Sequence, residues 1–450
     1  METLLLTEQN VKKSKPITLF SPSNPAPMET LYLSNIDQTV AFNVETVFFY
    51  EVPEVLGAAA SDIVRRVRLA VSEVLLVPYY FMAGRLRCNL LSNRLELVCN
   101  NKGVLFTGAT ASLRLKELGN LSFPNPSFQN LILSAEESGD LSNSLVLSIQ
   151  VTRFRCGGFS IGFVINHSIL DGRSAAEMML NLASICRGEG MKIAGDLDPD
   201  RSCIRARNPP QIKFQHTEYS DLPESSAISF TSPVVSSPAA RLSRISNFNL
   251  FCFDPDMIKR LKEKSGMNCS SFEAMVAHIW IARTKAVFVD RTKTASVLFA
   301  VDIRNKMSPP LPRRFIGNAV ITATASARAD ELSERGFSFG VGLVRGAIER
   351  VDNEYVRSVI DWLEVHKGVP SVLDGNFFVS AWWKLPFHEL DFGYGKPVYG
   401  GPVLIGGKEE FVLLLSDCSG VGKDREGGIN VWIALEQEKM LKFHSFVFQI

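Results

Sequence analysis

One short stretch of the chain combines residue types that can do proton-transfer chemistry. Residues 166–172 read Asn-His-Ser-Ile-Leu-Asp-Gly, which places His167 shortly before Asp171. The imidazole of histidine changes charge near neutral pH, so it can accept a proton from an attacking hydroxyl. Asp171 would then orient the ring or hold the turn. The bare spacing is a weak signal, because Asp171 is equally well placed to cap a following helix.

The elements on either side give His167 a defined position. Residues 143–154 mostly alternate apolar and polar side chains, residues 156–158 favour a turn, and residues 159–166 read as the returning strand. Residues 172–187 then carry apolar side chains at helical spacing. His167 therefore lies on a strand-to-helix turn, where a scaffold can present an imidazole to a cleft.

Strand and helix patterns alternate in both halves of the chain, which predicts an α/β or α+β fold. The expected strands are 43–50, 247–253, 297–301, 411–415 and 429–435, and the expected helices are 61–76, 254–264 and 271–285. At 450 residues the chain exceeds one ordinary core. Prolines and serines without periodicity follow residue 204, so we divide the chain into a domain at 1–204, a connector at 205–243 and a domain at 244–450.

Composition excludes several classes of function. A net charge of +1 argues against a nucleic-acid partner. The eight cysteines are irregularly spaced, so we expect no metal site and no redox motif, and a reducing compartment. The start of the chain lacks a signal-peptide core, and no apolar stretch is long enough to span a membrane. We therefore expect a cytoplasmic protein.

Two other catalytic patterns are rejected. The glycine-lysine groups at 393–396, 406–408 and 420–423 lack the spacing and the following serine or threonine of a phosphate loop. No G-x-S-x-G elbow is present for a serine hydrolase. His278, inside the helix expected at 271–285, is interpreted as structural.

Two motifs together resemble those of the plant BAHD acyltransferases. The chain has H-x-x-x-D-G at 167–172 and D-F-G-Y-G at 391–395, similar to the family's H-x-x-x-D-G and D-F-G-W-G in the same order. Further similar segments are A-G-R-L at 83–86, S-F-E at 271–273, and V-D-I-R at 301–304, followed by P-P-L-P and F-I-G-N. The resemblance covers nearly the whole chain, with Tyr394 in place of the usual tryptophan.

The resemblance implies an α/β fold of two chloramphenicol-acetyltransferase-like domains, with mixed sheets, flanking helices and a solvent channel between them. His167 would be the general base, and Asp171 would pair with an arginine, for which Arg304 is the candidate. Asp391, Gly393 and Gly395 would be structural and shape the coenzyme A side. Acyl-CoA would be a co-substrate, with no bound cofactor, no metal and no covalent acyl-enzyme. Family members are usually monomers.

The nearest likeness is the branch of ω-hydroxypalmitate and fatty-alcohol hydroxycinnamoyl transferases, carried by Y-L-S-N-I-D-Q at 32–38 and R-A-R-N-P-P at 205–210. It implies transfer of a hydroxycinnamoyl, other aromatic or fatty acyl group to a hydroxyl. Two alternatives stay open: N-acylation of a polyamine or other amine, and a non-catalytic relative that partners lipid-elongation enzymes. Trp382, Trp383 and Phe387 would suit an apolar substrate or would simply pack the core. The sequence does not identify the residues that bind coenzyme A.

Overall fold

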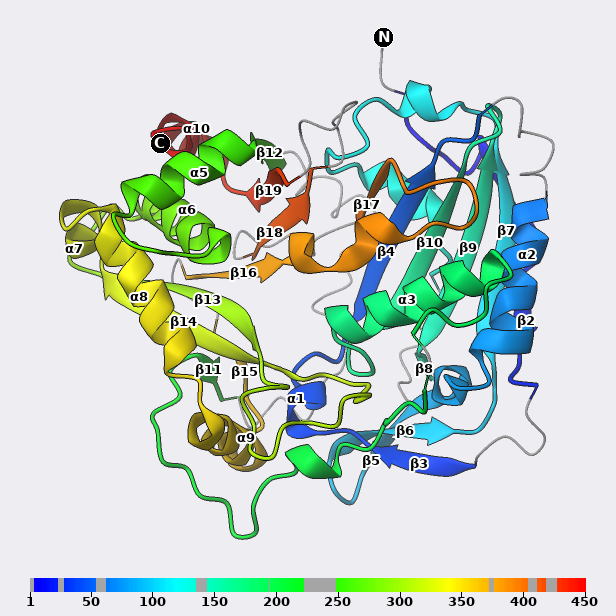
Figure 1. Ribbon diagram of the computed structural model, residues 1–450, viewed down its shortest axis with the longest axis horizontal. Helices are drawn as coiled ribbons and strands as arrows, with labels where there is room; N and C mark the ends of the chain where they lie inside the picture. Colours follow the sequence, from blue (N-terminus) through cyan, green and yellow to red (C-terminus); the bar gives the residue numbers. More distant parts are fainter. Residues whose placement is uncertain are drawn as a thin grey trace.

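The computed structural model describes residues 4–22, 28–53, 62–134, 144–193, 195–221, 248–371, 376–403, 411–417 and 427–450. Its two larger sheets lie side by side, with helices packed on each (Figure 1). A smaller sheet lies below the first of them in the figure. The chain is thus arranged as two α/β bodies.

The first sheet carries the strand that leads to His167. Its order is β1-β7-β9-β10-β4-β17, with β2 also paired to β7, and β7 and β9 run parallel. The bounds are β1 Val11–Lys13, β2 Ile17–Leu19, β4 Asn43–Tyr50, β7 Val104–Ala111, β9 Leu147–Phe154, β10 Phe159–Asn166 and β17 Tyr399–Pro402. Every residue of β10 is buried, as expected for a central strand of a covered sheet.

The second sheet belongs to the C-terminal half. Its order is β12-β19-β18-β16-β13-β14, and β16 is parallel to both β13 and β18. The bounds are β12 Phe248–Phe253, β13 Thr294–Asp302, β14 Val320–Arg328, β16 Phe377–Ala381, β18 Phe411–Ser416 and β19 Ile429–Ala434. The small sheet contains β3 Glu29–Tyr32, β5 Arg85–Asn89, β6 Arg94–Cys99 and β8 Ser144–Leu145, and β11 Tyr219–Ser220 pairs with β15 Val369–Pro370.

Helices cover both sheets. In the first body they are α1 Asn35–Gln38, α2 Ile63–Leu69 and α3 Gly172–Cys186, and in the second α5 Pro255–Lys264, α6 Ser271–Val287, α7 Ala329–Glu334, α8 Phe337–Glu349, α9 Asn353–His366 and α10 Gln437–Val447. Sequence signals explain their starts: Asp171 caps α3, Asp254 caps α5, and Ser270 forms a capping box with Glu273 on α6.

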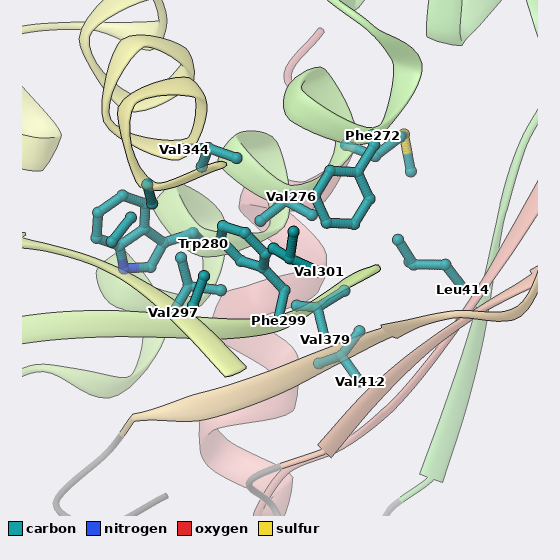
Figure 2. Packing of buried hydrophobic residues seen from close by; sticks show 14 of the residues in the cluster. Phe272, Val276, Trp280, Val297, Phe299, Val301, Val344, Val379, Val412 and Leu414 are labelled. Carbon is teal, nitrogen blue, oxygen red and sulfur yellow. The ribbon is translucent and has the colours of Figure 1, made fainter. Parts of the chain in front are cut away.

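The second body has an apolar core between α6, α8 and the sheet. Figure 2 shows Phe272, Val276 and Trp280 of α6 packed against Phe299 of β13 and Val344 of α8. All five side chains are buried, and Phe272 meets Phe299 edge-on with ring centroids 5.3 Å apart. This packing makes α6 a rigid support for the strands that reach the site.

Most expected elements are confirmed, with two local differences. The helix expected at 61–76 is α-helical only to Leu69 and continues as a π-helical turn over Ala70–Leu75. The strand expected from residue 143 is interrupted at Val146, which lies between β8 and β9. The glycine groups at 406–408 and 420–423 lie outside the described residues.

Two segments cross between the bodies. β17, from the C-terminal half, pairs antiparallel with β4 and so extends the first sheet (Figure 1). The described part of the connector, residues 205–221, lies on α9, where Arg207 Nε is 2.6 Å from Asp361 Oδ2. The remaining connector residues, 222–243, lie outside the described ranges. The domain boundaries at 204 and 244 stay a prediction.

Candidate active site

His167 lies directly after β10, on the turn that leads into α3. Its backbone N–H donates to the carbonyl of Phe42 at 2.8 Å, which joins the turn to the segment before β4. Ser168, Ile169 and Asp171 on the same turn are buried, whereas His167 is partly exposed. The ring of Phe42, 43% exposed, lies 5.5 Å from the imidazole centroid. The turn therefore presents one imidazole beside one accessible aromatic ring.

Asn318 fixes which nitrogen of His167 carries the proton. The Asn318 side-chain Nδ2 donates to Asp37 Oδ1 at 2.7 Å and to the His167 carbonyl at 2.8 Å. A carboxylate and a carbonyl only accept, so the NH₂ end of the amide must face them. Asn318 Oδ1 consequently faces His167 Nδ1 at 3.1 Å, and Nδ1 must be the donor. In the neutral ring, Nε2 then keeps its lone pair and can act as a base.

Asp171 is held by several donors. It caps α3 by accepting from the Ser174 N–H at 2.8 Å, accepts from the Ala319 N–H at 3.0 Å, and is 2.8 Å from Arg304 Nη2. The carboxylate is 2% exposed. Both roles that the sequence allowed, helix cap and support of the turn, are therefore compatible with its contacts.

Arg304 reaches this site from the end of β13. Its Nη2 also donates to Ser174 Oγ at 3.1 Å, and its Nη1 is 3.3 Å from Asp302 Oδ2. The arginine–aspartate pair that the resemblance implied is present. It connects the second sheet to the turn that carries the imidazole of the first.

The loop at 391–395 is organised by one carboxylate. Asp391 Oδ1 accepts from the backbone N–H groups of Gly393, Tyr394 and Gly395, at 2.7, 3.1 and 3.0 Å. Gly393 and Gly395 have φ of 96° and 93°, which residues with a Cβ rarely adopt. A Cβ on Gly393 would also lie 3.0 Å from Arg66 Nη2. Both glycines are therefore required by the loop conformation.

The tyrosine that replaces the usual tryptophan has a partner for its hydroxyl. Arg66 Nη1 of α2 donates to the Tyr394 hydroxyl at 3.0 Å, and Arg66 Nη2 donates to the carbonyls of Phe392 and Cys186. Burial raises the pKa of the Tyr394 hydroxyl, and Arg66 opposes part of that rise. Arg66 thus ties the loop to α2 and to the end of α3.

The aromatic residues suggested for an apolar pocket do not form one wall. The ring centroids of Trp382 and Phe387 are 5.6 Å apart, and both side chains line a small recess with His388 and Gly400. Trp383 packs elsewhere, stacked 6.2 Å from Phe272 on α6. Trp383 therefore belongs to the core of the second body.

Two other histidines, His278 and His216, make buried polar contacts. His278 Nε2 is 2.6 Å from the Val447 carbonyl, and burial lowers its pKa to about 4, which fits a structural role. His216 lies 2.9 Å from both Glu218 Oε1 and Ser358 Oγ, an arrangement reminiscent of a hydrolase triad. Ser358 is fully buried, however, so the cluster secures the connector to α9.

Asn318 and Asp37 are buried site residues that sequence reasoning missed. Both stood in quoted segments, F-I-G-N and S-N-I-D, but without a role. They are fully buried polar residues far from His167 in sequence, and no local pattern predicts such contacts.

Within the described ranges, no cluster of histidine, cysteine or acidic residues could hold a metal ion. No described helix has the length and apolar character needed to cross a bilayer.

Comparison with known proteins agrees with this architecture. Residues 11–447 match the family described as Transferase family. The chain is 34% identical to omega-hydroxypalmitate O-feruloyl transferase of Arabidopsis thaliana, covering 96% of this chain and 92% of the relative. It is 31% identical to fatty alcohol:caffeoyl-CoA acyltransferase of the same plant, covering 97% and 98%.

Solved structures share the fold. Vinorine synthase superposes with a TM-score of 0.72 at 21% identity, covering 97% of this chain and 98% of its own. TRI101 of F. sporotrichioides, complexed with coenzyme A and T-2, superposes with a TM-score of 0.71 at 14% identity, covering 93% and 97%. The expected chloramphenicol-acetyltransferase-like fold of two domains is confirmed.

The chain belongs to this transferase family, that of the BAHD acyltransferases. It is an acyl-CoA-dependent O-acyltransferase by class.

Proposed function

We propose that this enzyme transfers a hydroxycinnamoyl, other aromatic or fatty acyl group from coenzyme A to the hydroxyl of an apolar acceptor, with His167 as general base. The observation that carries the proposal is the contact between Asn318 Oδ1 and His167 Nδ1, which leaves Nε2 free to take a proton. The partly exposed position of the ring allows a substrate to approach.

The reaction needs one proton carrier and no covalent acyl-enzyme. The acceptor hydroxyl gives its proton to His167 Nε2 while its oxygen attacks the thioester carbonyl. The tetrahedral intermediate collapses, the carbon–sulfur bond breaks, and the departing thiolate takes the proton from Nε2. Asp171 and Arg304 hold the turn, and the loop around Asp391 supports the coenzyme A side. Much of the rate would come from holding two substrates in contact.

An apolar acceptor is supported by the environment of the base. Phe42, exposed beside His167, offers an apolar face to a molecule that approaches the imidazole. Two relatives are named for ω-hydroxypalmitate and fatty alcohols. A polyamine would need acidic partners, and Phe42 supplies none.

An open recess between α5 and the start of α6 suits the nucleotide end of the co-substrate. Lys262 and Ser271 line it with Lys259, which is 4.0 Å from Glu263, and coenzyme A carries phosphates that bind lysine cations. Lys262→Glu should raise KM for acyl-CoA while leaving the acceptor KM unchanged. Equal KM values for acyl-CoA in the variant and the wild type would exclude this recess as the binding site of the nucleotide end.

The domain division is part of the proposal. Residues 1–204 would form the domain with the base, residues 205–243 the connector, and residues 244–450 the domain with the Asp391 loop. β17 and that loop contact the first body, so the two domains would depend on each other for stability.

Release of free thiol tests the activity. Feruloyl, coumaroyl, benzoyl, acetyl and long-chain CoA donors would be paired with ω-hydroxy acids, fatty alcohols and polyamines. His167→Ala should lower kcat by about 10²–10⁴. His388→Ala is the control, since this exposed histidine pairs only with Glu389 among the described residues. A folded His167→Ala protein with wild-type kcat, or a wild type that releases no thiol with any pair, would refute the proposal. Thiol release with polyamines alone would instead support N-acylation as the function.

A further inference from the structure

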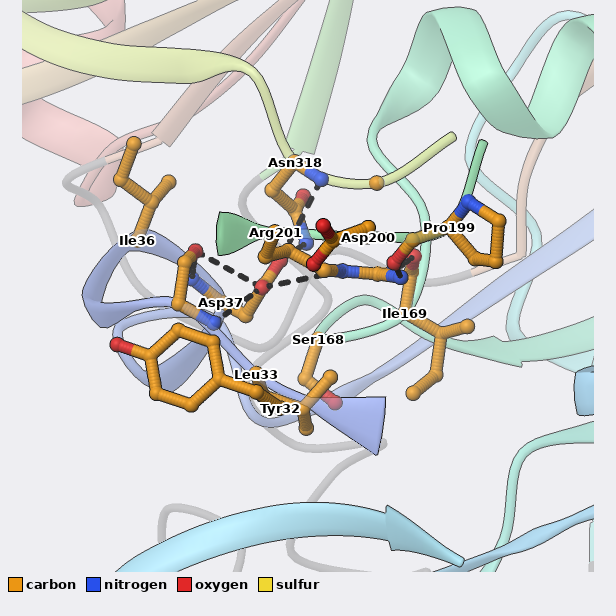
Figure 3. A network of polar contacts seen from close by, with 12 residues as sticks. Tyr32, Leu33, Ile36, Asp37, Ser168, Ile169, Pro199, Asp200, Arg201 and Asn318 are labelled. Atoms are coloured by element: carbon orange, nitrogen blue, oxygen red, sulfur yellow. Dashed lines mark hydrogen bonds and ion pairs between the residues drawn. The ribbon is translucent and has the colours of Figure 1, made fainter. Parts of the chain in front are cut away.

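Arg201 is a fully buried arginine next to the site network. Figure 3 shows its guanidinium between Asp37 and the backbone of two loops. Its Nε lies 3.6 Å from Asp37 Oδ2, its Nη2 donates to the Ile169 carbonyl at 3.0 Å, and its Nη1 donates to the Pro199 carbonyl. Both Arg201 and Asp37 side chains are 0% exposed. A single charged group therefore contacts a buried carboxylate and the turn that bears His167.

Asp37 needs this cation. Its Oδ2 accepts from the Ser34 N–H at 2.7 Å and from Ser34 Oγ at 2.8 Å, and its Oδ1 accepts from Asn318 Nδ2. These contacts satisfy an ionised carboxylate, but only Arg201 supplies a charge of opposite sign among its described contacts. A buried charge without such a partner is costly.

The carboxylate and the imidazole are joined through one amide. Asp37 binds the Nδ2 end of Asn318, and His167 binds the Oδ1 end. An unneutralised negative charge on the far side of this one amide would favour the imidazolium over the neutral ring. An imidazolium has no lone pair and cannot serve as a base.

We propose that Arg201 is a positioning residue of the transfer reaction, which neutralises Asp37 and holds the Ile169 carbonyl so that His167 stays a neutral base. The inference rests on the proposed role of His167. Arg201 touches no reacting atom. It acts through Asp37 and Asn318 on one side and through the turn on the other.

The remaining charges near the turn are already balanced. Asp171 pairs with Arg304, and Asp302 pairs with both Arg304 and Arg173. Among the described residues, Phe42 and Asn318, which make the ring contact and the hydrogen bond of the His167 imidazole, carry no charge. Removing the charge of Asp37 or of Arg201 should therefore change the electrostatic environment of the His167 imidazole.

The pH profile of kcat/KM tests the inference. Arg201→Met should move the acidic half-maximum upward by about half to one pH unit and lower kcat at least about tenfold. Arg201→Lys keeps the charge, so its half-maximum should stay at the wild-type pH although kcat falls. Asp37→Asn should move the half-maximum downward. Arg207→Met is the matched control, because Arg207 also pairs with a buried carboxylate, Asp361.

A purely structural role predicts a different pattern. Arg201→Met would then lower the melting temperature, as Arg207→Met should, and would leave the half-maximum of the pH profile unchanged. That result would show the inference to be wrong. If Arg201→Met does not fold, an unchanged half-maximum in Asp37→Asn would refute it equally. The titration of the His167 ring by NMR, assigned with His167→Gln, gives the same midpoint without turnover. Because this NMR midpoint needs no turnover, the inference can be tested even if none of the substrate pairs reacts.

Discussion

Arg304 Nη2 lies 2.8 Å from Asp171 Oδ2. This ion pair joins the second sheet to the turn that follows β10 and carries His167. Arg304 follows β13, whereas Asp171 caps α3 on the first sheet. The two side chains are 10% and 2% exposed. One contact therefore couples the stability of the enzyme to the position of His167.

Removing one partner of this pair should destabilise the fold. Asp171→Asn leaves Arg304 with only the more exposed Asp302 as an acidic partner, at an expected cost of about 3 kcal/mol, the low end for a broken buried pair. Denaturant unfolding measures the loss. Arg155→Ala, which breaks a largely exposed contact to Glu117, is the control and should cost under about 1 kcal/mol. Equal losses in the two variants would contradict the role of the buried pair.

Asn318→Ala should impair turnover more than substrate binding. Without Oδ1 opposite Nδ1, the His167 ring can adopt either tautomer and lose its orientation. We expect kcat to fall about 10²-fold with little change in KM for acyl-CoA. Asn43→Ala serves as the control, because Asn43 contacts Asn166 beside the base but not the ring. A kcat within a factor of about two of wild type would show that the amide is dispensable.

Tyr394→Phe should affect stability and leave the chemistry intact. The substitution removes the hydroxyl that accepts from Arg66 at 3.0 Å, while Arg66 keeps its contacts to Phe392 and Cys186. A loss of about 1–2 kcal/mol is expected from thermal or denaturant unfolding, because the donor is charged. A lower kcat at unchanged stability would instead mean that the loop contacts the substrates.

His278 should make stability fall in acid. Burial lowers its pKa to about 4, whereas an unfolded histidine titrates near pH 6.5. Between these values the unfolded state binds the extra proton, so the free energy of unfolding decreases as the pH falls from about 6.5 to about 4. The full effect is about 3 kcal/mol.

Replacement of this histidine isolates its contribution. His278→Gln should flatten the pH dependence of the unfolding free energy over that range, and the exposed His388→Gln should leave it unchanged. Parallel curves for wild type and His278→Gln would contradict the assignment.

Local patterns in the sequence predict the elements around His167. Alternation over 143–154, the turn residues at 156–158 and the Asp171 cap predict β9, the returning strand β10 and the start of α3, since each signal acts over a few residues. The paired motifs at 167–172 and 391–395 also indicated the family. Both glycines of the second motif proved to need the left-handed backbone that this motif implies.

Which polar groups meet around His167 depends on long-range packing. Asn318 is 151 positions from His167 and comes from the C-terminal half, whereas Asp37 lies in α1 and Arg201 in a loop after α3, 164 positions apart. Periodicity and caps report local backbone preferences, and they carry no information on long-range pairing. Buried polar groups must find partners wherever the fold places them. The proton-bearing nitrogen of His167 could therefore be assigned only once Asn318 was seen between it and Asp37.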